Sequence, residues 1–340
     1  MSRRNFLFGL FLVVIYSVWY LYEPFLMPIA IASLLAVATS GLSVYLDKKV
    51  KLNILKTAIL TVGLGLIFFA PISYALNAVS SIANNFDVDI VEKVVNIKES
   101  FVLPEYLGFA KPHIKEFLES INVTNVTTIF FKYTTLILKN SAGFVKDMVV
   151  ILIFYFFVNL YAKKLVAYIK DILPFDNNSS FFIEISSVMN IVFYSTLITA
   201  IFEGALFSMI VIYYGYDGLL FGILYGFASL IPVIGGAIMW IPIALYQYST
   251  GDSFGAGVIA IYSIVVISLI ADTFIKPMII EYVNTLTIKN PSNISPLLIF
   301  FAMIAGLTTF GFWGVIIGPA ITTFFISFLK IYQILLKEKG

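Results

Sequence analysis

Long apolar segments separated by short polar ones make up most of this chain. A helix needs about 20 apolar residues to cross the hydrocarbon core of a bilayer, and segments of roughly this length recur from end to end. The pattern predicts membrane spans at 6–22, 25–46, 57–83, 142–161, 183–214 and 255–276. We expect a turn at Glu23-Pro24 between the first two, because proline is disfavoured inside a helix.

Two further apolar segments, 219–248 and 296–334, are interrupted by proline and glycine. The first splits into halves of about 12 residues, and a helix of that length is only about 18 Å long. Such halves are too short for the roughly 30 Å hydrocarbon core. We therefore expect broken, re-entrant hairpins, with full spans as the alternative. The similar placing of the two interruptions suggests an internal repeat of the kind found in transporters.

Residues 84–140 carry many charges between short amphipathic stretches, which predicts a small helical domain on the membrane surface. The chain is expected to be an all-α, polytopic membrane helical bundle, with spans 1–3 in 1–83, this extramembrane domain in 84–140 and a transmembrane transport region in 141–340. Lysine and arginine gather in the short loops assigned to the side of the N-terminus, which predicts a cytoplasmic N-terminus.

The composition excludes several classes of function. Charged residues make up 12% of the sequence, whereas a soluble domain has about 25%. There is no cysteine and one histidine, so thiolate and histidine-based metal sites are not expected. There is no Walker loop, and an intramembrane aspartyl protease needs two facing aspartates. We expect a membrane protein that is not an enzyme, with no cofactor, metal or nucleic-acid partner.

Glu203 lies near the middle of an apolar span, where an acidic side chain costs about 2.5–3.5 kcal/mol on insertion scales. On a helix, Ser195, Thr199 and Glu203 fall on one side and form a polar stripe. The functional interpretation is a proton or cation site coupled to transport. The alternative is a structural hydrogen bond between helices.

Asp272 and Lys276 are four residues apart and share a helix face, with the acid before the base. The functional interpretation places Asp272 on the path of a solute or ion. In the alternative, Lys276 reaches the membrane surface and Asp272 pairs with it.

The interruptions themselves are candidate sites, because backbone groups freed at membrane depth are tolerated only where they are buried or line a cavity. The alternative is that these glycines allow close helix packing. Asn293 and Pro296 are expected to cap the second broken segment. The residues proposed to line a substrate path are Pro232, Gly235, Gly236, Gly311, Gly314, Gly318 and Pro319.

Four motifs occur in a characteristic order, and they are FEG at 202–204, LIPVIGG at 230–236, DTFIKP at 272–277 and FGFWGVIIGP at 310–319. They resemble the autoinducer-2 exporter family, the PerM-like permeases, and the similarity extends over nearly the whole chain. Thr273 departs from the family pattern, in which asparagine is usual at this position.

The resemblance implies a multi-pass protein of the bacterial inner membrane that forms a homo-oligomer, with a pentamer suggested. Members of the family have been linked to autoinducer-2 export and others to sodium–proton antiport, so the resemblance does not fix the substrate. We expect an ion-coupled secondary transporter or exporter of a small polar solute that uses Glu203, with Asp272 assisting. A sodium(proton) antiporter and a passive channel-like pore are the alternatives.

Overall fold

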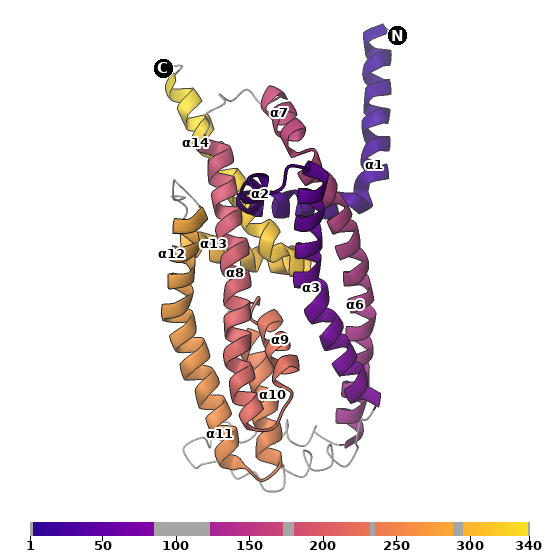
Figure 1. Cartoon of the computed structure of the whole chain (residues 1–340). Helices are drawn as coiled ribbons and strands as arrows, with labels where there is room; N and C mark the ends of the chain where they lie inside the picture. Colours follow the sequence, from indigo (N-terminus) through magenta and orange to yellow (C-terminus); the bar gives the residue numbers. More distant parts are fainter. Residues whose placement is uncertain (1–2, 85–122, 173–179, 232–234, 288–294, 339–340) are drawn as a thin grey trace. The chain divides into compact units, whose positions relative to one another are not determined.

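A computed structural model describes residues 3–84, 123–172, 180–231, 235–287 and 295–338 of the chain (Figure 1). Every regular element in these residues is helical, which confirms the predicted all-α class. The elements are α1 (Arg3–Ala38), α2 (Ser40–Asp47), α3 (Asn53–Asn84), α6 (Val123–Leu160), α7 (Ala162–Ile172), α8 (Ser180–Tyr213), α9 (Gly218–Ala228), α10 (Gly235–Ser249), α11 (Ser253–Tyr262), the π-helix η2 (Ser263–Ile275), α12 (Lys276–Thr287), α13 (Pro296–Phe310), the 3₁₀ turn η3 (Gly311–Trp313) and α14 (Gly314–Glu338).

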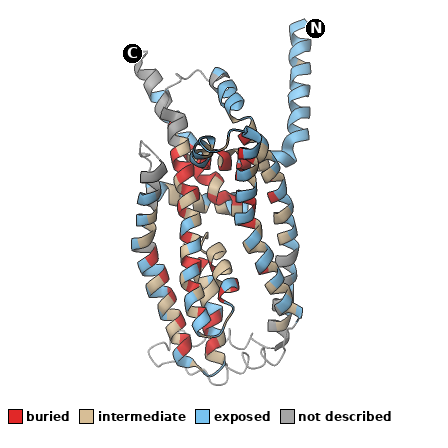
Figure 2. Ribbon diagram, in the orientation of Figure 1, coloured by how far each residue is buried: buried red, intermediate tan, exposed pale blue. Residues whose placement is uncertain are grey.

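Six segments of the described helices are long and apolar enough to span a membrane. Large apolar side chains such as Phe11, Leu66 and Phe324 are exposed along them, as expected where lipid replaces water. Exposed residues are pale blue in Figure 2 and occur along these helices. The chain is therefore a multi-pass membrane protein. The six segments are Arg3–Ala38, Asn53–Ser81, Lys139–Leu160, Ile185–Tyr213, Ser253–Ile279 and Leu297–Leu329.

The chain forms two compact units, each assembled from separate stretches of sequence. The first unit contains Met1–Leu66, Val145–Phe193 and Thr287–Gly340, and the second contains Ile67–Phe144 and Tyr194–Leu286. Glu203 and its neighbours on α8 belong to the second unit. α13 and α14, near the C-terminus, belong to the first.

The predicted turn at Glu23-Pro24 is wrong, because both residues lie inside α1, which continues to Ala38 and bends part way along (Figure 1). Pro24 and Pro28 each lack a backbone N–H, and membrane helices tolerate proline where other groups satisfy the freed carbonyl. The predicted span 6–22 and the first part of the predicted span 25–46, as far as Ala38, therefore belong to one helix. The side of the membrane on which the N-terminus lies stays a prediction, because it depended in part on that turn.

The chain breaks instead at Thr39, between α1 and α2. The Thr39 hydroxyl donates to the carbonyl oxygen of Leu35 at 2.7 Å and is 2.7 Å from the hydroxyl of Tyr155 on α6. Thr39 and Tyr155 are both buried. This polar contact links the end of α1 to α6 within the first unit.

α6 is one helix of 38 residues. Its first part, 123–140, was assigned by the sequence to the extramembrane domain, and it continues without a break into the apolar segment that begins at Lys139. Residues 85–122, the remainder of that predicted domain, lie outside the described part of the chain.

α13 and α14 form a helical hairpin in the first unit, and α1 packs against α14. α13 ends at Phe310, and the φ of 62° at the following Gly311 lies in the region that favours glycine. A Cβ atom on Gly306 would overlap the carbonyl group of Gly314, and one on Gly318 would overlap the carbonyl group of Ala302. The two helix backbones are therefore in direct contact, which only small residues permit.

The core of the second unit is apolar and is shared by α8, α9, α10, α11 and η2. Phe207 and Tyr225 lie at its centre, with ring centroids 4.5 Å apart. This core holds α9 and α10 against α8, and thereby fixes the surroundings of the polar residues on α8. Its buried members are Phe207, Val211, Tyr225, Ile243, Ala244, Ile259 and Ile267.

Candidate functional site

Three of the predicted site residues occupy the buried side of α8. Ser195 is 8% exposed, Thr199 is 5% exposed and Glu203 is 4% exposed. They are spaced four residues apart, so they form a line along one side of the helix. Most other positions in this helix are apolar, so the line is a polar track in an otherwise apolar part of the second unit.

Beside this track the backbones of α8 and α9 touch. A Cβ atom on Gly222 would lie 2.8 Å from the carbonyl oxygen of Gly204, the residue after Glu203. A Cβ atom on Gly226 would lie 2.8 Å from the carbonyl oxygen of Ala200. The short helix α9 therefore approaches α8 most closely beside the buried acid, through glycines four residues apart.

Three buried hydroxyl groups of the second unit have no hydrogen-bond partner among the described residues, and they belong to Thr127, Thr199 and Ser263. Ser263 begins η2 and is 0% exposed. A buried hydroxyl without a partner costs about 1–3 kcal/mol, and such groups in native proteins call for a specific explanation. Thr199 lies one helical turn from Glu203, so the unused hydroxyl belongs to the same polar track.

The first interruption brings the ends of α9 and α10 together. The amide of Gly235 donates to the carbonyl oxygen of Ile231 at 3.1 Å. A Cβ atom on Gly235 would overlap the carbonyl group of Ala228, and one on Gly236 would overlap the Tyr225 hydroxyl. These glycines thus permit close packing. Pro232 lies outside the described residues, and the role of this segment in a substrate path stays a prediction.

At the second interruption, side-chain hydroxyl groups donate to backbone carbonyl oxygens. Pro319 is buried inside α14, and the hydroxyl of Thr323 donates to its carbonyl oxygen at 2.7 Å. The hydroxyl of Thr322 donates to the carbonyl oxygen of Gly318 at 2.9 Å. At the start of α13, Ser295 takes the N-cap position and Pro296 the first helical position, where its missing N–H is not needed. Asn293 lies outside the described residues.

Asp272 lies in the π-helix η2, and Lys276 is the first residue of α12. π-helical geometry is rare and is frequently found at functional sites. The sequence gives no local indication of this geometry, because the apolar pattern fits an α-helical span equally well. The predicted pairing of Asp272 with Lys276 stays a prediction.

The sequence analysis missed a polar network at the turns of the second unit. The Tyr216 hydroxyl donates to Gln247 Oε1, and Gln247 Nε2 donates to Asp252 Oδ2 at 2.8 Å. The Gly255 amide donates to Asp252 Oδ1 at 2.8 Å. Burial, with Tyr246 and Asp252 nearby, raises the pKa of Tyr216 to about 12. Tyr216 therefore remains a neutral donor, and the network joins the α8–α9 turn to the α10–α11 turn.

Asp217 has a similar role beside this network. Its side chain caps α9 by accepting from the Leu220 amide at 3.0 Å, and it also accepts from the Tyr74 hydroxyl on α3 at 2.9 Å. An aspartate directly before a helical pattern is a recognisable N-cap signal. That signal, present at both Asp217 and Asp252, could have found these two residues but not their side-chain partners.

The network predicts an acid-dependent loss of stability that is specific to Asp252. Hydrogen bonds from the Gly255 amide and then from Gln247 lower the pKa of this carboxyl below its usual 3.8. A depressed pKa contributes stability that is present above the unfolded value and is lost as the pH falls through the folded value. The difference in thermal stability between wild type and Asp252→Asn should therefore shrink as the pH falls below about 4.

Thermal unfolding in detergent, measured for both proteins at matched pH values, checks this expectation. Asparagine retains an N-cap acceptor, so the comparison isolates the charge. Other groups that titrate in both proteins cancel in the difference. A difference that is constant over the whole acid range would contradict the assignment.

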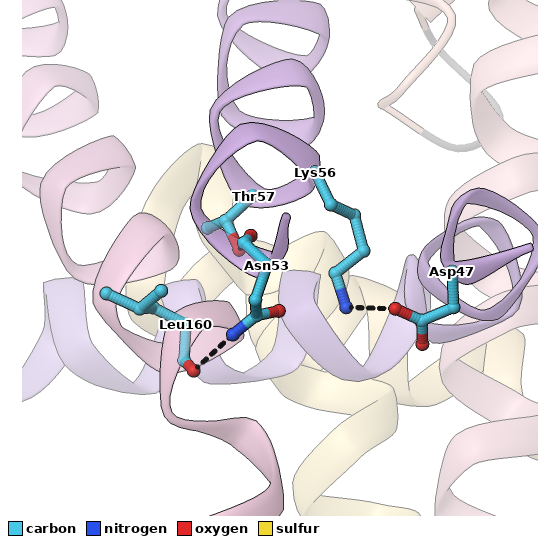
Figure 3. Close-up of polar contacts among 5 residues, drawn as sticks. All are labelled: Asp47, Asn53, Lys56, Thr57 and Leu160. Atoms are coloured by element: carbon cyan, nitrogen blue, oxygen red, sulfur yellow. Dashed lines mark hydrogen bonds and ion pairs between the residues drawn. The ribbon is translucent and has the colours of Figure 1, made fainter. Parts of the chain in front are cut away.

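A second polar cluster lies in the first unit, where α2, α3 and α6 meet (Figure 3). Lys56 Nζ is 2.8 Å from Asp47 Oδ1, and the Lys56 side chain is 7% exposed. Asn53 Nδ2 donates to the carbonyl oxygen of Leu160 at 3.0 Å, and Thr57 is fully buried. The cluster holds the start of α3 against the end of α6.

A shallow groove of about 340 Å³ also lies in the first unit, between α3 and α6. Apart from Thr61, its lining is apolar, and it contains none of the predicted site residues. A polar solute has no charged group to bind there, so the groove is not the candidate site. The described residues also contain no cluster of three or more His, Asp or Glu side chains able to hold a metal ion.

Comparison with known proteins agrees with this architecture. The family model described as AI-2E family transporter matches residues 9–334. A Helicobacter pylori (strain J99) protein named "Putative transport protein" is 35% identical over 337 residues, covering 98% of this chain and 96% of the relative. A Methanocaldococcus jannaschii protein with the same description is 25% identical over 333 residues, covering 94% and 92%. The chain therefore belongs to the AI-2E transporter family.

Proposed function

We propose that this protein is a secondary transporter that exports a small polar solute of the autoinducer-2 type, coupled to an ion gradient through Glu203. The observation that carries the proposal is the burial of Glu203, which is 4% exposed in an apolar helix. Membership of a transporter family supports the general activity. The solute, the coupling ion and the direction of transport are part of the proposal.

Burial makes the free energy of the protein depend on whether Glu203 is ionised, and ion coupling requires such a dependence. An ionised carboxylate at membrane depth is costly, and taking up a proton or a cation removes most of that cost. The free energy of two transporter conformations can then depend on whether the site is occupied, which is how a ligand shifts an equilibrium. The Thr199 hydroxyl, one turn away, offers a hydrogen bond to a polar solute.

The other predicted residues complete the proposed route. Asp272, with Lys276, is proposed to assist Glu203, and the stretches around Gly235-Gly236 and Gly311 are proposed to line the path. The packing contacts at Gly235 and Gly314 are compatible with that role, because a hinge between short helices also needs close backbone contact. We further propose a homo-oligomer, with a pentamer as the form suggested by the family resemblance, in the bacterial inner membrane with a cytoplasmic N-terminus.

Flux measurements on purified protein in proteoliposomes test the proposal. Autoinducer-2 and other small polar solutes are loaded inside or outside, with an imposed proton gradient, an imposed sodium gradient or neither. We expect saturable flux that one of the gradients accelerates. Saturable sodium–proton exchange without any solute would instead favour a sodium–proton antiporter, in which the buried Glu203 would bind the exchanged ion. Ionic conductance without saturation would favour a channel and contradict the proposal.

A further inference from the structure

One end of the first unit carries a band of exposed lysines at the level where two membrane spans terminate. The apolar segment of α3 begins at Asn53 and that of α6 ends at Leu160. The 3.0 Å hydrogen bond from Asn53 Nδ2 to the Leu160 carbonyl oxygen holds these two ends at the same level (Figure 3). Whatever follows Leu160 must therefore leave the bilayer at this boundary.

α7 follows after one residue, Tyr161, and is amphipathic. Leu165 and Ile169 are four residues apart on one side of the helix, whereas Lys163 and Ala167 lie on the opposite side. Residues 163–169 are all exposed (Figure 2). Leu165 is 41% and Ile169 is 43% exposed. The described part of the chain thus leaves the apolar side of α7 uncovered.

The same end of the unit is rich in positive charge. Asp47, in the same region, is already paired with Lys56 at 2.8 Å. Two lysines lie over tyrosine rings, Lys49 at 4.8 Å from the centroid of Tyr45 and Lys164 at 5.8 Å from that of Tyr161. Tyrosine is enriched at membrane–water interfaces. The exposed lysines of this end are Lys48, Lys49, Lys51, Lys163 and Lys164.

We propose that this end of the protein is a binding surface for anionic phospholipid, with α7 lying in the interface and its apolar side among the acyl chains. Three observations support lipid as the occupant. α7 follows a span after one residue, its apolar side is exposed at the bilayer boundary, and its lysines lie away from that side, as in a basic helix that lies on a membrane. Lysines near an anionic surface each contribute favourably to such binding.

Site-directed fluorescence on the full chain tests the proposal, and the absence of cysteine makes single labelling straightforward. Ile169→Cys carries an environment-sensitive NBD label on the apolar side, and Ala167→Cys carries the matched label on the polar side. Both proteins are placed in nanodiscs of phosphatidylcholine with increasing phosphatidylglycerol. We expect the emission at 169 to shift to shorter wavelength as phosphatidylglycerol increases. Dithionite should then reduce the label at 169 several times more slowly than the label at 167.

Charge variants test the anionic preference. Lys163→Gln with Lys164→Gln, in the labelled Ile169→Cys protein, should raise the phosphatidylglycerol fraction needed for the half-maximal shift, by up to roughly fivefold per lysine. The matched control is Lys132→Gln with Lys139→Gln, which removes two exposed lysines from the part of α6 that belongs to the second unit. This control should leave the half-maximal fraction unchanged.

Three results would overturn the proposal. Equal emission from both labels in every lipid mixture would place α7 in water. A shift at 169 that is independent of phosphatidylglycerol would remove the anionic preference. Failure of spin-labelled lipid in the nanodisc to quench the label at 169 would mean that protein, and not acyl chains, covers this side. None of these results depends on solute flux, so the proposal and the transport function can fail separately.

Discussion

Replacing Glu203 by glutamine should abolish coupled solute flux in proteoliposomes and leave the protein folded. Glutamine has nearly the same size and shape but cannot exchange a proton or hold a cation by charge. Because Glu203 is 4% exposed, the substitution also removes the cost of burying a charge. We therefore expect a thermal stability equal to or above that of wild type, together with a loss of at least about tenfold in gradient-driven flux, the size of a 1.4 kcal/mol change in barrier.

The matched control is the same substitution at an exposed position. Glu281 lies in α12 and is exposed, so Glu281→Gln should retain normal flux. Glu203→Asp keeps the charge on a shorter side chain and should retain part of the flux. If Glu203→Gln transports normally and remains coupled, the glutamate has a structural role, and the proposed mechanism is wrong.

Replacing Gly314 by alanine should destabilise the α13–α14 hairpin strongly. The added Cβ would overlap the carbonyl group of Gly306, and a backbone atom cannot move aside as the end of a side chain can. Overpacking usually costs about 1–3 kcal/mol, and direct backbone overlap belongs at the upper end. We expect a loss of about 3 kcal/mol, seen as a lower thermal transition in detergent and lower yield in the membrane.

Gly63→Ala in α3 is the matched control for this substitution. Gly63 lies in the same unit and in a helix interior, and a Cβ atom there has no other atom within 4 Å. Alanine at such a position is favoured over glycine by about 0.5–1 kcal/mol, so stability should stay the same or rise slightly. Equal stability for Gly314→Ala and wild type would show that the two helices can separate freely at this point.

The structural features that could be predicted from the sequence are those whose information is local. A polar line spaced by four residues in an apolar segment predicts a buried helix side, and Ser195, Thr199 and Glu203 are buried as expected. The end of α9 at Ala228 and the break between α13 and α14 at 311–313 likewise agree with the proline and glycine pattern. Helical periodicity and chain breaking depend on neighbouring residues alone, so one sequence contains enough information for them.

Two kinds of feature could not be predicted from the sequence. The first is contacts between residues that are distant in the chain, and the second is the tolerance of proline inside a membrane helix. The bonds from Tyr216 to Gln247 and from Asn53 to Leu160 form only after the helices are in place. The predicted turn at Glu23-Pro24 is wrong because proline ends helices most readily in water, whereas this helix lies in an apolar setting. Proline ends a helix less often in a membrane, because the backbone N–H and C=O groups around it have few hydrogen-bond partners other than those that the helix supplies.

The bend in α1 limits where this helix can lie relative to the bilayer. A helix of 36 residues is about 54 Å long, nearly twice the thickness of the hydrocarbon layer. Prolines 24 and 28 also leave the carbonyl oxygens four residues earlier without their usual amide donors. Hydrocarbon cannot solvate those oxygens, so this stretch must lie at the depth of the headgroups or against another polar group. The twenty residues before it can then cross the membrane, while the residues after it run along the inner core of their unit.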